Sequence, residues 1–99
     1  MKLPTMLNIR TVSEVRDTIL LSLDNNQNIA LEIEDDSQAD LSFVQLIEAA
    51  RVYSRSQGKS LALARPAPAG VMDVLRRGGF VDGISRETVK FWTHQETVR

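Results

Sequence analysis

Apolar residues recur every three or four positions in the first quarter of the chain, which is the spacing of one face of an α-helix. The residues of this face are Val12, Val15, Ile19 and Leu23. Thr11 and Glu14 have the spacing of a capping box, in which both side chains bind free backbone N–H groups at a helix start. We therefore expect an amphipathic helix that ends near the turn-forming residues 24–26. An extended segment over residues 3–9 precedes it, and Pro4 favours a sheet edge there.

Two other segments alternate apolar and other residues with a period of two, which is the pattern of a strand with one buried face. They are residues 29–34 and, more weakly, residues 61–64. Strands of a parallel sheet that is buried on both faces read instead as unbroken runs of Val, Ile and Leu. The alternation therefore predicts a sheet with helices packed mainly on one face.

Helical spacing returns between and after these strands. Residues 41–57 predict a second helix with Gly58 as its stop. Its apolar face consists of Phe43, Leu46, Ile47, Ala50 and Tyr53. A third helix is predicted to start at Pro68 and to stop at residues 78–79. Its apolar contacts are Val71, Val74 and Leu75.

Residues 85–95 contain both helix formers and strand formers. We favour a helix that is capped by Ser85 and has Val89 and Trp92 facing inward. The order strand, helix, repeated three times, then predicts a small α/β protein with right-handed crossovers and parallel neighbours among the later strands.

The composition limits the size of any site. The 99 residues, of which 42% are apolar and 25% charged, fit a single domain over residues 1–99, in which a deep active site is not expected. The chain has no cysteine, which excludes disulfides, thiolate nucleophiles and zinc-finger sites. The N-terminus has no signal-peptide pattern, and no apolar run is long enough to span a bilayer. These features predict a cytoplasmic protein without membrane insertion.

Charge is distributed unevenly, although the net charge is only −1. Residues 32–40 include five acidic and no basic residues, whereas residues 51–77 include six basic residues and one acid. Such runs are usually solvated faces. The basic residues Arg51, Arg55, Arg76 and Arg77 have little aromatic interleaving, so no nucleic-acid binding is expected.

The residue types needed for catalysis do not occur together. His94 is the only histidine, and neither a cysteine nor a suitably spaced acidic pair accompanies it. The acids Glu34, Asp35, Asp36 and Asp40 offer oxygen ligands for Mg²⁺, but their order lacks the pattern of a calcium-binding loop. No glycine-rich loop opens a helix to hold a phosphate. We therefore expect a protein that is not an enzyme and has no cofactor and no metal site.

The start of the second helix is the candidate binding site. Asp40 is well placed as its N-cap, where a carboxylate accepts backbone N–H groups at the positive end of the helix dipole. Ser42 falls at about the second helical position, near the surface. Helical spacing places Ser42, Gln45, Ala49 and Val52 on one partly apolar stripe, which is suited to contact a partner protein.

The chain resembles the STAS domain, which sulphate transporters share with bacterial anti-sigma-factor antagonists. Residues 7–16 are similar to the end of its first strand and the start of its first helix, and residues 31–33 to its central strand. Residues 68–80 are similar to its third helix and closing turn. Residues 40–43, Asp-Leu-Ser-Phe, fall where the family has an Asp-Ser-Ser-Gly-like motif. This resemblance covers nearly the whole chain and implies a small STAS-like mixed sheet.

The resemblance also implies a modification site. In the antagonist branch of the family, the second serine of the motif is phosphorylated by an anti-sigma factor that is also a kinase, and Ser42 is the matching residue. Asn8 matches a position at the end of the first strand where the family often has Asp. The chain departs from the motif at Leu41, which replaces the first serine, and at Phe43, which replaces the glycine.

The function implied by the resemblance is that of a non-enzymatic bacterial signalling module. Its partner would be a regulatory protein such as an anti-sigma factor, a kinase or a chemotaxis-type component. The expected partner-binding residues are Asn8, Asp40, Ser42, Phe43 and Gln45. The alternative is the small cytoplasmic STAS subunit of an ABC-type lipid transport system, which would bind a membrane ATPase.

Overall fold

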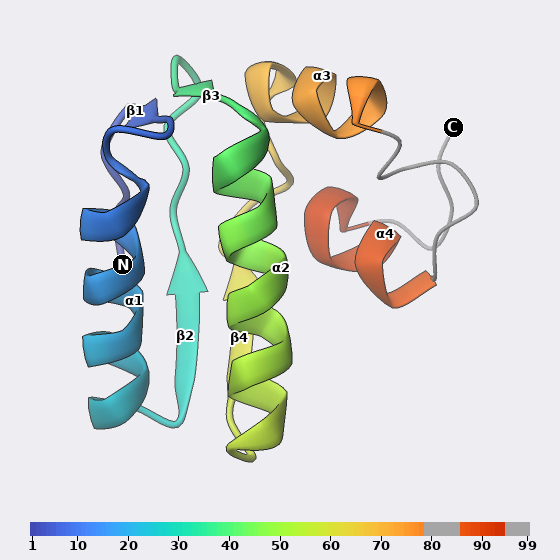
Figure 1. Cartoon of the computed structure of the whole chain (residues 1–99). Helices are drawn as coiled ribbons and strands as arrows, with labels where there is room; N and C mark the ends of the chain where they lie inside the picture. Colours follow the sequence, from blue (N-terminus) through green and yellow to red (C-terminus); the bar gives the residue numbers. More distant parts are fainter. Residues whose placement is uncertain (79–85, 95–99) are drawn as a thin grey trace.

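The computed structural model describes residues 1–78 and 86–94 of the chain (Figure 1). The helices in this part are α1 (Val12–Asn25), α2 (Leu41–Ser56), α3 (Ala69–Arg77) and α4 (Arg86–Thr93). The strands are β1 (Met6–Leu7), β2 (Asn28–Leu31), β3 (Gln38–Ala39) and β4 (Ser60–Leu63). The chain is therefore a small α/β protein, as the sequence predicts, and its Cα radius of gyration of 12.6 Å is that of a compact chain of this length.

The strands form two parallel pairs, β2 with β4 and β1 with β3. The N-terminal residues connect the two pairs, because Lys2 forms a parallel bridge with Glu32 just beyond β2. The backbone N–H of Leu3 donates to the carbonyl of Glu32 at 2.9 Å, and the N–H of Glu32 donates to the carbonyl of Met1 at 2.8 Å. Residues 1–7 thus run alongside β2 and then β3. Every strand pair in the described residues is parallel, so none of the antiparallel pairs expected in a mixed sheet occurs among them.

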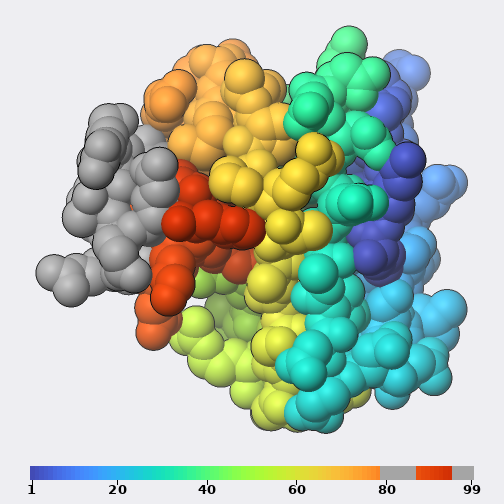
Figure 2. All heavy atoms as spheres, turned by 180° about the vertical axis from the view of Figure 1, so that it is seen from behind, coloured from blue at the N-terminus to red at the C-terminus, as the bar shows by residue number. Residues whose placement is uncertain are grey.

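The two faces of the β2–β4 pair differ in burial. Ile29, Leu31, Leu61 and Leu63 are buried, whereas the alternate residues Ala30 and Ala62 are exposed. The helices α1 and α2 lie next to each other over the buried face (Figure 1). From the opposite side, β2 and β4 are visible at the molecular surface (Figure 2). This is the arrangement that a period of two predicts for strands with one buried face.

The core is one cluster to which every helix contributes. In α3 the buried residues are Val71, Val74 and Leu75, as predicted. In α1 they are Val15, Ile19 and Leu23, whereas Val12, which was expected on the same face, is only half-buried. The expected helix near the C-terminus is α4, and both Val89 and Trp92 are buried. The residue predicted to cap it, Ser85, lies outside the described residues.

The predicted face of α2 is partly wrong. Phe43, Ile47 and Ala50 are buried as expected, but Val44 and Ser54 are also buried and Tyr53 is 39% exposed. The helix is therefore rotated about its axis relative to the expected face, because it contacts α1, β4 and α3 at once. It ends as predicted, with Gly58 at a φ of +68°, a conformation that glycine adopts without strain.

Three local details near the strand ends differ from the expectations. Thr11 and Glu14 do not form a capping box, since no side-chain hydrogen bond caps α1. The Thr11 hydroxyl instead binds the preceding turn, where it donates to the carbonyl of Met6 at 2.7 Å. The short strand β3 was not predicted, and it lies in the segment between the second strand and the second helix. Pro68 is the N-cap of α3 and not its first helical residue.

Candidate functional site

The carboxyl ends of β1 and β3 lie together at the start of α2. Asn8 directly follows β1, Asp40 directly follows β3, and the N–H of Asp40 donates to the carbonyl of Leu7 at 3.0 Å. Parallel strands end at the same edge of a sheet, which is why residues far apart in the sequence meet here. We call this place the Asp40 corner, and it consists of Asn8, Ile9, Asp40, Leu41 and Ser42.

The carboxylate of Asp40 binds two segments of the chain. Its Oδ1 accepts the backbone N–H of Ser42 at 3.0 Å, which makes it the N-cap of α2, and also accepts the Ser42 hydroxyl. Its Oδ2 accepts the N–H of Ile9, in the turn between β1 and α1, at 3.1 Å. One side chain therefore connects the start of α2 to the turn after β1.

These contacts stabilise the charged form of the carboxylate. The hydrogen bond from the Ser42 hydroxyl lowers the pKa of Asp40 most, and the backbone N–H groups of Ile9 and of the first turn of α2 lower it further, whereas desolvation opposes this. Asp40 is thus ionised at neutral pH and is a weak base. The Ser42 hydroxyl donates to this carboxylate, so the corner lacks the strong base that would activate a serine nucleophile.

Asn8 contributes to the turn rather than to a cavity. Its Oδ1 accepts the N–H of Arg10 at 3.0 Å, and its own N–H donates to the Thr11 hydroxyl at 3.1 Å. Asn8 is half-buried. The side chain therefore fixes the position of the backbone that presents Ile9 beside Asp40.

Three apolar side chains are exposed in the Asp40 corner or close to it in the sequence. Ile9 is 71% exposed, Met6 46% and Leu41 42%. Next to them is a small hollow of about 260 Å³ between the start of α2 and the end of α3. It is lined by Ala39, Asp40, Leu41, Val74, Arg77 and Gly78. The sequence pattern does not single out these apolar residues, although Leu41 stands outside the apolar face of its helix.

The five residues predicted to bind a partner are not all at this surface. Asn8, Asp40 and Ser42 gather at the corner, and Gln45 is exposed one helical turn after Ser42. Phe43 is only 1% exposed and belongs to the core, so its side chain does not face a partner. The physical reason is the helical spacing that Phe43 shares with Ile47 and Ala50.

The described residues contain no group of three or more side chains placed to hold a metal ion. Two of the clustered acids pair with bases, Glu34 with Lys2 at 2.8 Å and Asp35 with Arg65 at 3.8 Å. His94 directly follows α4 and lines a separate groove beside β4. Across residues 1–78 and 86–94, no helix has the length and apolar character needed to cross a membrane.

No protein-family model, curated protein or solved structure matched this chain. The fold and the corner define a small α/β protein in which a capped helix start, exposed apolar residues and a surface serine lie together.

Proposed function

We propose that the chain is a non-enzymatic, STAS-like signalling module that binds a regulatory protein through the Asp40 corner. Binding is switched by phosphorylation of Ser42. The observation that carries this proposal is the hydrogen bond from the Ser42 hydroxyl to the carboxylate that caps α2. Because of this bond, phosphorylation of the half-buried Ser42 hydroxyl would change the hydrogen bonds of the Asp40 carboxylate, which also binds Ile9.

A phosphate on Ser42 would change this corner in two ways. It replaces the hydroxyl hydrogen, so Asp40 loses a donor, and it adds about −1.5 to −2 charges beside a carboxylate. The positive end of the α2 dipole offsets this by only about 0.3–1 kcal/mol. The added charge therefore mainly changes the affinity of the corner for a bound partner.

The surroundings of Ser42 are suited to a protein partner. Ile9, Met6 and Leu41 expose apolar surface, and Gln45 offers a polar contact at its rim. A charged phosphate next to such a surface would repel a partner that packs closely on it. A difference of about 1–3 kcal/mol is enough for a change of about 5–150-fold in affinity.

The architecture supports the family assignment that belongs to this proposal. Parallel strands alternate with helices in chain order, and α1 and α2 cover the same face of β2 and β4. A STAS-like fold would account both for this arrangement and for the Asp-Leu-Ser-Phe motif at the start of α2.

The test is affinity purification of the tagged chain from its native cells, with intact-mass analysis of the chain itself. We expect a copurified regulatory protein and a fraction of the chain heavier by one phosphate group at Ser42. With that partner, Ser42→Asp should weaken binding by about 5–150-fold, because it adds charge at the corner. Ser42→Ala removes the hydrogen bond to Asp40 but adds no charge, so it should weaken binding less than Ser42→Asp.

Ser13 provides a matched control, because it is the second residue of α1 as Ser42 is the second residue of α2, and it is exposed. Ser13→Asp adds the same charge at an equivalent helix position and should leave binding unchanged. Equal binding by the unmodified chain, Ser42→Asp and Ser42→Ala would refute the switch. Copurification of a membrane ATPase instead of a regulatory protein would favour the alternative role in lipid transport.

A further inference from the structure

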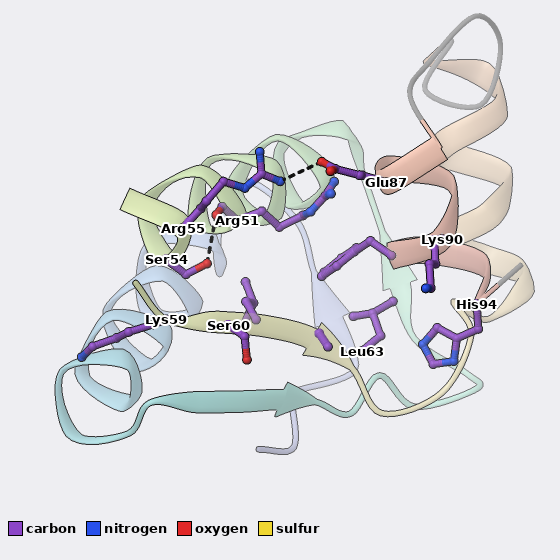
Figure 3. Close-up of a pocket in the computed structure, with 12 residues that line it drawn as sticks. Arg51, Ser54, Arg55, Lys59, Ser60, Leu63, Glu87, Lys90 and His94 are labelled. Atoms are coloured by element: carbon purple, nitrogen blue, oxygen red, sulfur yellow. Dashed lines mark hydrogen bonds and ion pairs between the residues drawn. The ribbon is translucent and has the colours of Figure 1, made fainter. Parts of the chain in front are cut away.

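A groove of about 600 Å³ runs along the outer edge of β4 (Figure 3). Its floor is the strand itself, and its walls are the second half of α2 and one side of α4. In Figure 2 it is the hollow between α4, in red, and β4, in yellow. The groove lies away from the Asp40 corner, because the 13 residue steps of α2 from Ser42 to Arg55 span about 20 Å.

The strand at the floor pairs on one side only within the described part of the chain, where its neighbour is β2. The N–H of Ser60 donates to Gln27 at 3.0 Å and that of Ala64 to Leu31 at 2.8 Å, so residues 60, 62 and 64 face this neighbour. Backbone direction alternates along a strand, and Leu61 and Leu63 therefore direct their N–H and C=O groups towards the groove. A strand edge of this kind can pair with another extended chain.

The side chains around this edge are predominantly basic. Four basic residues and one acid line the groove, namely Arg51, Arg55, Lys59, Lys90 and Glu87. Arg55 and Glu87 form an exposed ion pair at 3.2 Å, and Figure 3 shows Lys90 and His94 reaching into the groove from α4. The apolar part of the lining comes from Leu61, Leu63 and Phe91.

We propose that this groove binds an acidic peptide segment in extended conformation, which adds to the sheet as a new strand beside β4. Its backbone pairs with Leu61 and Leu63, and its acidic side chains lie near Arg55 and Lys90. Apolar side chains of the same segment pack against Phe91. The four residues of β4 provide about 13 Å of edge for this pairing.

Nucleic acid fits the groove less well, although its charge is also negative. The guanidinium of Arg51 already lies over the ring of Phe91, 4.5 Å from its centroid, and covers a face on which a base would stack. Arg51 is also held by Glu48 at 2.9 Å and has a side chain that is only 10% exposed. The free edge of a strand offers backbone N–H and C=O groups in the spacing of a β-ladder, which the backbone of a peptide matches and that of a nucleic acid does not.

The test measures binding of a fluorescent seven-residue peptide of alternating glutamate and valine to the full chain, by fluorescence anisotropy at low salt. Arg55→Glu should weaken binding by about tenfold, because it reverses a charge at the groove. Arg16→Glu is the matched control, since Arg16 is also an exposed arginine with an acidic partner, at 3.3 Å, but lies on α1. It should leave the affinity unchanged, and equal loss in both variants would overturn the proposal.

A second pair of probes separates strand pairing from simple charge attraction. In an extended peptide, all glutamate N–H groups point to one edge and all valine N–H groups to the other. One peptide is N-methylated at every glutamate and the other at every valine, so both keep the same charge. One of the two should lose binding and the other should retain it. Equal binding by both, or tighter binding of a short single-stranded DNA, would overturn the proposal.

Discussion

Asp40 is the residue that links most of the features of the candidate site. It caps α2, it accepts the Ser42 hydroxyl, and it accepts the N–H of Ile9 from a turn that is 31 positions away in the sequence. The position of Asp40 before an amphipathic helix predicts the cap. The bond to Ile9 has no local signal, because it depends on the parallel pairing of β1 with β3.

Replacement of Asp40 should make stability depend less on pH. Asp40→Ala removes the cap and should lower the free energy of unfolding by about 0.5–2 kcal/mol at pH 7. Because the pKa of Asp40 is lowered in the folded chain, its contribution is complete from about one pH unit above the unfolded value of about 3.9. It is lost as the pH falls through the lower, folded pKa.

Urea unfolding from pH 7 down to about pH 3 measures this effect. The difference between the unmodified chain and Asp40→Ala should stay constant until about pH 5 and then narrow towards acid. Asp36→Ala, at an exposed acid in the turn before β3, is the control and should follow the unmodified chain. A difference that is unchanged at the lowest pH would contradict the role of the carboxylate.

At the level of elements, contacts between helices and strands decide which residues of a helix are buried and where the helix starts, and periodicity alone leaves both open. The expected face of α2 is rotated because the helix contacts α1, α3 and β4 at once, and this buries Val44 and exposes Tyr53. The start of α3 is similarly fixed by a neighbour. A Cβ on Gly70 would lie 2.9 Å from the backbone oxygen of Ser37, in the segment before β3.

Gly70→Ala should therefore destabilise the chain, although alanine is the better helix former by about 1 kcal/mol. The close contact with Ser37 should reverse the sign and cost about 1–3 kcal/mol in the free energy of unfolding. Thermal and urea unfolding measure it.

Gly58→Ala is a useful comparison. Its φ is +68° and a Cβ there would meet nothing within 4 Å, so any cost comes from backbone strain alone, about 1–2 kcal/mol. Stabilisation by Gly70→Ala would show that α3 does not approach residue 37 so closely.

At the scale of the whole molecule, α4 is integrated into the same core as the other helices. Trp92 is only 1% exposed and belongs to the main cluster of buried residues. Its indole N–H donates to Glu48 of α2 at 2.8 Å, and the same glutamate binds Arg51. This contact positions α4 beside β4 and so forms one wall of the groove.

The chain should unfold in a single cooperative transition, as is usual for a domain of this size with one core. Trp92 is the only tryptophan, so its fluorescence reports on α4, whereas far-UV circular dichroism reports on all helices. Both signals should give the same midpoint in urea. A fluorescence midpoint at a lower urea concentration would show that α4 detaches first.

Much of the secondary structure was predictable from the sequence, and less of the site. In the described residues, α1, α2, α3 and the two longer strands follow from periodicity, since each buries one face, whereas the segment of α4 also contains strand formers. The Thr11–Glu14 box failed because the Thr11 hydroxyl finds acceptors in the turn before it. The sequence places Phe43 both on the apolar face of α2 and among the partner-binding residues. Its burial in the core excludes contact with a partner.

The sequence pattern alone specifies the helices α1, α2 and α3, the apolar faces of α1 and α3 and the N-cap of α2 at Asp40, because these features depend on neighbours within a few positions. The packing of the whole chain brings Ile9 and Ser42 to the carboxylate of Asp40, pairs β3 with β1 and leaves a basic groove along the outer edge of β4. These features depend on contacts between residues about 30 positions apart or more, and such contacts form only when the core places the strands side by side.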